Sequence, residues 1–188
     1  MMADHIFRGG ARGYWSGLLE PATVDWCEMN YALCSFIAEF FNTFSSLAIV
    51  FAGAIGLILN RTNPLREHRF DVAYVAVIVV GIGSVAFHAT LLRPMQMLDE
   101  VPMLYSAQAM VYCLLENDTV APRYGRWLPA GLVVHAVLIT GLVTLSDGRL
   151  QFVLFHLSFG TIEFCARCRI QNSAPPRQHC EDYGCSRV

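Results

Sequence analysis

Four stretches of this chain run for most of a membrane thickness without an acidic residue or an arginine. They are Phe40–Leu59, Val72–Leu92, Val101–Leu115 and Leu128–Ser146. A helix needs about 20 predominantly apolar residues to cross a bilayer, and the third stretch reaches that length only with residues 98–100 at its start. A fifth and weaker stretch, Leu150–Ile162, is followed directly by Glu163. These run lengths predict several membrane helices in one domain.

Composition supports the same conclusion. Hydrophobic residues make up 55% of the 188 positions and charged residues only 15%, which is too few charges for an ordinary soluble domain. A large soluble helical core would need polar faces at a spacing of about 3.6 residues, and residues 72–83 have none. We therefore predict an all-α fold, a polytopic membrane helix bundle with about five transmembrane helices. Their expected positions are residues 32–59, 71–92, 98–116, 127–146 and 149–164.

The arginines predict an orientation. All 13 basic residues are arginines, and five spans would place nine of them on the side of residues 61–69 and four on the other side. Because cytosolic loops carry the excess of positive charge, we expect an outside or lumenal N-terminus and a cytosolic C-terminus. The first 30 residues contain no apolar core of signal-peptide length. Two glycosylation sequons, at Asn60 and Asn117, fall on the predicted cytosolic side, and we interpret both as chance occurrences.

Polar side chains interrupt the second and third apolar stretches. Ser84 and His88 are four residues apart and therefore share one helix face. Pro94 is expected to break the chain after that helix, and Asp99 and Glu100 begin the next apolar run. Ionisable groups are costly inside a membrane, so their presence there indicates a functional site. We expect a compact polar cluster between two membrane helices.

A second polar cluster precedes the first apolar stretch. Asp25, Glu28 and Glu39 supply three carboxylates within 15 residues, and Asn30 adds an amide. Oxygen ligands of this kind are those that Ca²⁺ prefers, although the loop of an EF-hand is absent. The alternative is that Asp25 and Glu28 cap the first helix and that Glu39 is a buried partner of an arginine.

Both clusters belong to longer sequence blocks. The first block contains Asp25-Trp26-Cys27-Glu28-x-Asn30-Tyr31 and Ile37-Ala38-Glu39-Phe40-x-Asn42-Thr43-x-Ser45. The second contains Gly83-Ser84-x-x-Phe87-His88-x-Thr90-Leu91 and Met95-Gln96-x-Leu98-Asp99-Glu100-x-Pro102-Met103-x-Tyr105. Together, in this order and spacing, they resemble the alkaline ceramidase family of integral membrane amidohydrolases. The resemblance runs in register from about Gly13 to Gly160.

The resemblance implies a seven-helix bundle in endoplasmic reticulum or Golgi membranes that hydrolyses the amide of ceramide to a sphingoid base and a fatty acid. It implies a calcium site formed by Asp25, the Trp26 carbonyl, Glu28, Asn30 and Glu39. It also implies a catalytic zinc ion with His88 as one of three histidine ligands, and Ser84 and Asp99 as catalytic residues.

The implied chemistry is coherent. Three imidazoles leave a fourth position on Zn²⁺ for water and lower the pKa of that water toward about 7. Asp99 would orient or deprotonate the water and then protonate the leaving amine. Ser84 would donate a hydrogen bond to the developing oxyanion. The expected partners are ceramide and membrane lipid, with no nucleic acid and no protein partner inferred.

The histidines depart from the family pattern. The other two zinc ligands belong to a His-x-x-x-His segment on the last helix, and no two histidines of this chain are four apart. The six are His5, His68, His88, His135, His156 and His179. We interpret His135 and His156 as buried, hydrogen-bonded side chains, and we expect this chain as written to be inactive.

The C-terminal residues lose the hydrophobic periodicity. We predict an incomplete alkaline ceramidase-like membrane domain over residues 1–164 and a non-homologous, disordered tail over residues 165–188. Four of the seven cysteines lie in that tail. A four-thiolate zinc site is the alternative, but the second cysteine spacing and the missing core argue against a zinc ribbon.

Three classes of function remain open. The first is a zinc-dependent ceramide amidohydrolase, of which this chain is an incomplete form. The second is a catalytically inactive, calcium-binding membrane relative that binds lipid. The third is a receptor-like seven-helix protein. The block around Asp25 favours the first two, and bound zinc would separate the first from the second.

Overall fold

The chain folds into a bundle of long helices in the computed structural model, which describes residues 13–116, 124–146 and 148–173. Within these ranges the helices are α1 (Phe40–Thr62), α2 (His68–Thr90), α3 (Arg93–Leu115), α4 (Trp127–Leu145) and α5 (Gly148–Ser173). The same ranges contain no strand, only two isolated β-bridges. The predicted all-α bundle is therefore confirmed.

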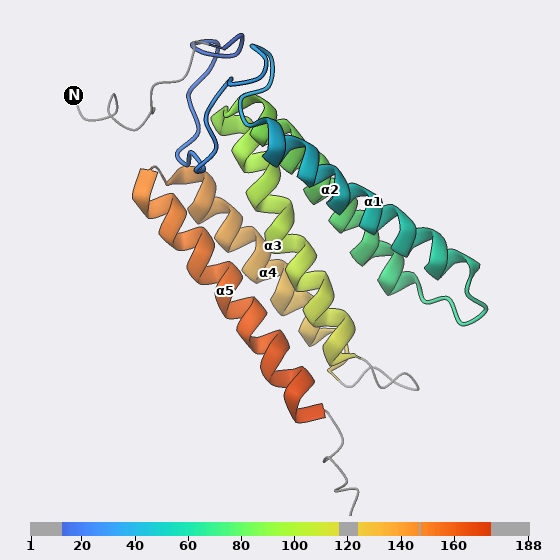
Figure 1. The fold of residues 1–188 in the computed structure, drawn as a ribbon. Helices are drawn as coiled ribbons and strands as arrows, with labels where there is room; N and C mark the ends of the chain where they lie inside the picture. The colour runs from blue at the N-terminus through green and yellow to red at the C-terminus, as the bar shows by residue number, and fades with distance from the viewer. Residues whose placement is uncertain (1–12, 117–123, 147, 174–188) are drawn as a thin grey trace, which may run out of the picture.

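Helix α3 is the central element of the bundle. It contacts α2 on one side and α4 and α5 on the other, while α1 packs only on α2 among the helices. Figure 1 shows this order, with α1 and α2 on one flank of α3 and α4 and α5 on the other. A core cluster of Leu104, Val143 and Phe155 joins α3 to α4 and α5. Residues from three separate helices thus bury one another.

Three of the described helices, α1, α2 and α4, are long and apolar enough to cross a membrane. The exposed side chains of α1 include Phe44, Phe51 and Ile58. Large apolar side chains facing outward suit contact with lipid rather than water. Helix α3 is not among the three, because its first two turns carry a charged and polar sequence that includes Asp99 and Glu100.

Helix α1 begins later than predicted, at Phe40 instead of residue 32. The backbone N–H groups of Ala38 and Glu39 donate to the carbonyls of Ala89 and His88, at 2.9 and 3.0 Å. These are carbonyls in the last turn of α2, which have no partner within their own helix. The segment before α1 therefore runs extended across the end of α2 instead of continuing the helix.

Helix α3 begins earlier than predicted, at Arg93 instead of residue 98. Pro94 lies in its first turn, where a missing N–H costs nothing and the fixed φ suits a helix. The break is made earlier in the chain, by Leu91, which adopts a left-handed conformation with φ of 50°. Pro94 thus starts one helix and does not end the other.

Helix α5 extends nine residues past its predicted end at residue 164. The prediction of a disordered tail from residue 165 is wrong for residues 165–173, which are helical. Glu163 and Arg167 form an ion pair of 3.7 Å with i,i+4 spacing, and Ala, Arg and Gln are good helix formers. Residues 174–188 lie outside the described residues, so their predicted disorder stays a prediction.

Candidate active site

The junction between α2 and α3 gathers the polar residues predicted from the second block. Gly83 sits where these helices meet, and a Cβ there would collide with the backbone carbonyl of Leu98 and lie 3.1 Å from the Cα of Asp99. Only glycine permits so close an approach of two backbones. This contact brings the Ser84 turn of α2 against the Asp99 turn of α3.

His88 is held by a buried carboxylate. Its Nδ1 lies 2.5 Å from Oε2 of Glu39, whose residue is 0% exposed. A carboxylate accepts hydrogen bonds, so Nδ1 carries the proton and donates it. The other ring nitrogen, Nε2, is then free to accept a proton or bind a ligand. The alternative interpretation of the sequence expected an arginine as the buried partner of Glu39. The structure shows His88 in that place instead.

Glu39 also ties the N-terminal segment to α1. Its Oε1 accepts the backbone N–H of Trp26 at 3.0 Å, and its Oε2 accepts the side-chain amide of Asn42 at 3.0 Å. Three donors from separate parts of the chain therefore converge on one carboxylate. This carboxylate links the predicted calcium cluster to His88.

Ser84 and Asp99 are both buried beside this histidine. Ser84 Oγ lies 3.0 Å from Oγ of Ser46 on α1. Because the Oγ of Ser46 donates to the Asn42 carbonyl at 2.7 Å, Ser84 is the donor of this pair. Asp99 lies in the turn of α3 that packs against Gly83 of α2, and its Oδ1 is buried without a hydrogen-bond partner among the described residues. The structure thus leaves one carboxylate oxygen of Asp99 at the His88 end of α2 available to a ligand.

The residues of the first block lie together in the segment before α1. The Nδ2 of Asn30 donates to both carboxylate oxygens of Asp25, at 3.1 Å each. Glu28 accepts the backbone N–H groups of Phe41 and Asn42, at 2.7 and 2.9 Å. Glu28 therefore caps α1, as the alternative interpretation predicted.

The buried Oδ1 of Asn30 bears on the calcium prediction. It has no hydrogen-bond partner among the described residues, and a buried carbonyl oxygen of this kind is costly unless something binds it. Calcium would satisfy it. However, no group of three or more His, Cys, Asp or Glu residues within the described ranges is arranged to hold a metal. Calcium binding at Asp25, Trp26, Glu28, Asn30 and Glu39 stays a prediction.

Tyr31 lies in the same segment before α1. Its ring packs against the core formed by Ala38, Phe87 and Leu91. Burial raises the pKa of the Tyr31 hydroxyl, and a hydrogen bond with Ser16 partly opposes that change. The hydroxyl is therefore neutral over the whole physiological range.

Sequence reasoning missed a buried amide–carboxylate network next to the site. The Nε2 of Gln96 donates to Glu100 at 2.6 Å, and that of Gln151 donates to the other oxygen of Glu100 at 3.1 Å. The Oε1 of Gln96 accepts the backbone N–H of Thr23 at 2.7 Å. The network joins the N-terminal segment, α3 and α5. The i,i+4 spacing of Gln96 and Glu100 was its only visible signal.

Comparison with known proteins identifies the family. The family model described as Ceramidase matches residues 19–183. The chain belongs to the ceramidase family. It is 46% identical to mouse alkaline ceramidase 3 over 154 residues, which cover 81% of this chain and 55% of that protein. It is 33% identical to a putative alkaline ceramidase of Dictyostelium discoideum, with 86% of this chain and 63% of that protein covered.

A plant relative has the same sequence identity to this chain as the Dictyostelium protein. The alkaline ceramidase of Arabidopsis thaliana is 33% identical over 141 residues, which cover 71% of this chain and 53% of that protein. The chain thus spans between about half and two thirds of the length of these curated ceramidases.

The other histidines of this ceramidase-family chain do not join His88. His135 on α4 lies 3.1 Å from the amide of Gln108 on α3, so the predicted hydrogen bond is present, but His135 is half-buried and not buried as predicted. The Nδ1 of His156 on α5 is hydrogen-bonded to the carbonyl oxygen of Phe152, at 2.8 Å. The prediction that His156 is buried is wrong: it is exposed, because that face of α5 has no neighbouring helix among the described elements.

The zinc site expected from the ceramidase family is therefore not assembled by the described residues. His68 lies at the opposite end of α2 from His88 and is exposed, while His5 and His179 fall outside the described ranges. One imidazole is far short of the three or four protein ligands that zinc sites use. We derive no catalytic step through zinc from this chain.

Proposed function

We propose that this chain supplies one part of the active site of a ceramide amidohydrolase, which cleaves the N-acyl amide of ceramide to a sphingoid base and a fatty acid in endoplasmic reticulum or Golgi membranes. The single observation that carries the proposal is the Glu39–His88 hydrogen bond beside buried Ser84 and Asp99. An ordinary membrane helix has no reason to bury these four groups together. Membership of the ceramidase family supports the substrate class.

Glu39, Asp99 and Ser84 have distinct roles in this proposal. Glu39 fixes the ring of His88 and its tautomer, and it is a positioning residue. Asp99 takes the proton from the attacking water and returns it to the amine as the C–N bond breaks. Ser84 redirects its hydroxyl proton from Ser46 to the oxygen of the amide carbonyl as negative charge develops there. Burial excludes water and strengthens both interactions.

The proposal is tested in a protein that has the full length of a relative. A chimera would join this chain, up to the end of the region aligned with mouse alkaline ceramidase 3, to the remaining C-terminal part of that protein. We expect it to release fatty acid from labelled ceramide, and we expect His88→Ala, Ser84→Ala and Asp99→Asn each to lower the rate at least about 100-fold, the range of single catalytic groups.

Ser45→Ala is the matched control for Ser84→Ala. Ser45 is exposed on α1, and its hydroxyl donates to the Asn42 carbonyl of the same helix. Its replacement should leave the rate of the chimera unchanged. A folded chimera whose turnover survives Ser84→Ala and Asp99→Asn would contradict the proposed roles.

A second candidate function is a catalytically inactive, calcium-binding relative that binds lipid. The observations that favour it are that the other described histidines have partners or positions away from His88 and that the buried Oδ1 of Asn30 has no partner among the described residues. Under this proposal the polar groups at the α2–α3 junction stabilise the bundle, and the N-terminal cluster binds calcium. Ceramide binding without hydrolysis by the chimera would favour this candidate.

A further inference from the structure

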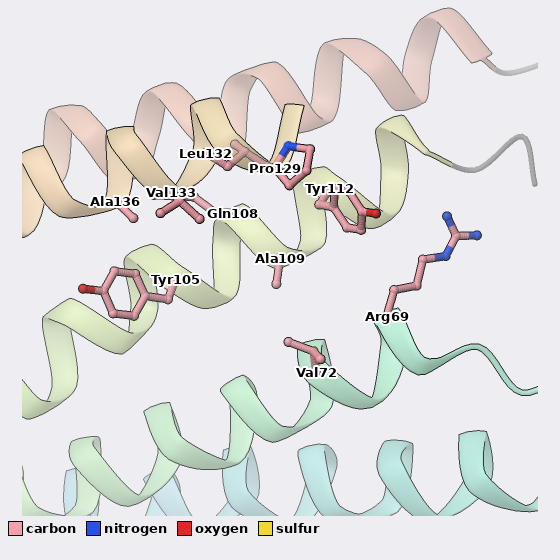
Figure 2. Close-up of a pocket in the computed structure, with 10 residues that line it drawn as sticks. All are labelled: Arg69, Val72, Tyr105, Gln108, Ala109, Tyr112, Pro129, Leu132, Val133 and Ala136. Carbon is pink, nitrogen blue, oxygen red and sulfur yellow. The ribbon is translucent and has the colours of Figure 1, made fainter. Parts of the chain in front are cut away.

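The sides of the helix bundle are apolar and open. Helix α1 packs only on α2 among the described helices, and Phe44 and Phe51 on its outer face are exposed. Elsewhere, α2, α3 and α4 line a groove of about 320 Å³ whose walls include Val72 and Val133 (Figure 2). Exposed apolar side chains on membrane-spanning helices suit contact with lipid. These sides therefore mark the part of the chain that lies within the hydrocarbon core of the membrane.

The length of α1 places its first turn at one boundary of that core. The 23 residues Phe40–Thr62 rise about 34 Å, and the hydrocarbon core is about 30 Å thick. The segment before α1 is bonded to the same end of the bundle. The N–H groups of Ala22 and Ala38 donate to the carbonyls of Leu91 and Ala89, at 2.9 Å each. This segment is therefore held at the level of the lipid headgroups.

Two runs of this segment carry no charge, although they lie outside the membrane-spanning helices. Residues 13–19 read Gly-Tyr-Trp-Ser-Gly-Leu-Leu, and residues 31–38 read Tyr-Ala-Leu-Cys-Ser-Phe-Ile-Ala. The N–H of Tyr14 donates to the carbonyl of Ser35 at 2.8 Å, so the two runs lie side by side. Their large exposed apolar side chains are Tyr14, Leu18, Leu19, Leu33 and Phe36. So many on a short surface segment indicate contact with a membrane or with another protein.

Tyr14, Trp15 and Phe36 form an aromatic cluster that joins the two runs. The centroid of the Tyr14 ring lies 4.9 Å from that of Trp15 and 5.0 Å from that of Phe36. The Nε1–H of Trp15 donates to the Phe36 carbonyl at 2.8 Å, so the only donor of the indole ring is satisfied within the protein. Tyr14 and Phe36 are each 58% exposed. The cluster therefore presents apolar ring surface outward and needs no water for the Trp15 donor.

Along the chain, this cluster is followed by the exposed aromatic side chains of α1. Phe36 is four residues before Phe40, whose ring centroid lies 5.6 Å from that of Phe41 and 4.6 Å from that of Phe44. Phe41 and Phe44 are exposed on the helix whose outer face meets lipid. Aromatic side chains concentrate where the hydrocarbon core meets the headgroups. Continuity with this lipid-facing helix favours the membrane over a protein as the partner of the cluster.

We propose that the N-terminal segment inserts the Tyr14–Trp15–Phe36 cluster into the interface of the lipid bilayer, among the headgroups and the adjoining parts of the acyl chains. The segment then acts as an anchor that fixes the depth of Glu39, three residues after Phe36, relative to the membrane surface. The inference concerns membrane contact and requires no hydrolysis. It therefore stands or falls independently of the proposed function.

The test measures the depth of the Trp15 side chain in the 188-residue chain. Trp26→Phe and Trp127→Phe remove the other two tryptophans, and Trp26→Phe keeps the backbone N–H that Glu39 accepts. The protein is reconstituted into phosphatidylcholine vesicles whose acyl chains carry bromine either near the headgroup or near the chain end. We expect the strongest quenching of Trp15 fluorescence by bromine near the headgroup, because interfacial segments lie about 5–10 Å into that boundary. Quenching by aqueous acrylamide should be largely lost.

Leu65→Trp is the matched control, made together with Trp15→Phe, Trp26→Phe and Trp127→Phe. Leu65 is 84% exposed and lies in the loop between α1 and α2, close in sequence to Arg61 and Arg66. A tryptophan there should be quenched by acrylamide and hardly by either bromine. Quenching of Trp15 by bromine that is no stronger than in this control would overturn the proposal. Strongest quenching by bromine near the chain end would overturn it as well.

Phe36→Ser tests whether the rings insert together. It removes one exposed ring and keeps the backbone carbonyl that accepts the Trp15 donor. We expect acrylamide quenching of Trp15 to rise toward that of the control, while circular dichroism shows unchanged helix content. Trp15 that is already as open to acrylamide as the control in the unsubstituted cluster would show that the cluster faces water, which would exclude the membrane as its partner.

Discussion

Glu39 accepts hydrogen bonds from the Trp26 backbone, the Asn42 amide and the His88 ring. Glu39→Ala removes the acceptor of these three partly buried donors. Each such loss costs roughly 1–3 kcal/mol, and we expect the free energy of unfolding to fall by about 3 kcal/mol or more. Thermal unfolding in detergent, followed by circular dichroism, measures the change.

The control for this substitution is Glu20→Ala. The Glu20 carboxylate is 79% exposed and lies 3.7 Å from Arg93, a surface pair of the kind that contributes about 0–1 kcal/mol. Its removal should hardly change the melting temperature. If Glu39→Ala melts at the same temperature as Glu20→Ala, the carboxylate does not organise this end of the bundle.

Calcium binding is also predicted at the scale of residues. An ion that binds only the folded chain stabilises it, by about 2.7 kcal/mol at a concentration 100 times its dissociation constant. We expect calcium to raise the melting temperature and a chelator to lower it. Asn30→Leu should remove most of this response, because it deletes the buried Oδ1 that has no partner among the described residues. An identical melt with calcium and with chelator would exclude the site.

At the scale of elements, the junction of α2 and α3 depends on Gly83. Gly83→Ala would drive its Cβ into the backbone of Leu98, which cannot move aside as a flexible side chain can. Overpacking of this kind costs about 1–3 kcal/mol, and it would also separate Ser84 from Asp99. We therefore expect lower thermal stability of the chain and lower activity of the chimera.

Gly131→Ala is the control for Gly83→Ala, and we expect it not to destabilise the chain. Gly131 lies in α4, and a Cβ added there would meet nothing within 4 Å, so alanine adds helix propensity without a clash. The substitution should be neutral or stabilising, by up to about 1 kcal/mol. Equal destabilisation by both glycine substitutions would show that the close approach at Gly83 is not the cause.

The positions of the elements were predictable where apolar runs decide them. Three of the predicted spans correspond to helices that are long and apolar enough to cross a membrane. The errors occur at helix ends, whose positions depend on tertiary contacts. Helix α1 starts late because Ala38 and Glu39 bond to the end of α2, and no local pattern announces that pairing. Helix α5 continues past the apolar stretch, where Ala166 and Arg167 are good helix formers and Glu163 pairs with Arg167.

At the scale of the whole molecule, residues close in sequence were predicted to share a site, and distant ones were not. The i,i+4 spacing of Ser84 and His88 places them on one face. The pairing of His88 with Glu39 spans 49 residues, and that of Glu100 with Gln151 spans 51. Contacts of that range depend on how the helices pack, which spacing alone does not specify.

The described residues do not bring together the three histidines that the family resemblance implies for a zinc site. A single neutral imidazole cannot hold Zn²⁺ in the three-histidine geometry expected from the family. His135 is engaged with Gln108 on another face of the bundle, and His156 lies exposed on α5. Neither can join His88 without a rearrangement of the helices.

We therefore expect a polypeptide of these 188 residues, expressed alone, to bind no stoichiometric zinc and to release no measurable fatty acid from ceramide. Elemental analysis of the purified protein measures the zinc content, and labelled ceramide at alkaline pH measures the release. The chimera with the mouse relative serves as the positive control under the same conditions. One equivalent of zinc in the 188-residue chain, with turnover that is lost in His88→Ala, would contradict this prediction, because it would require a complete site built from these residues alone.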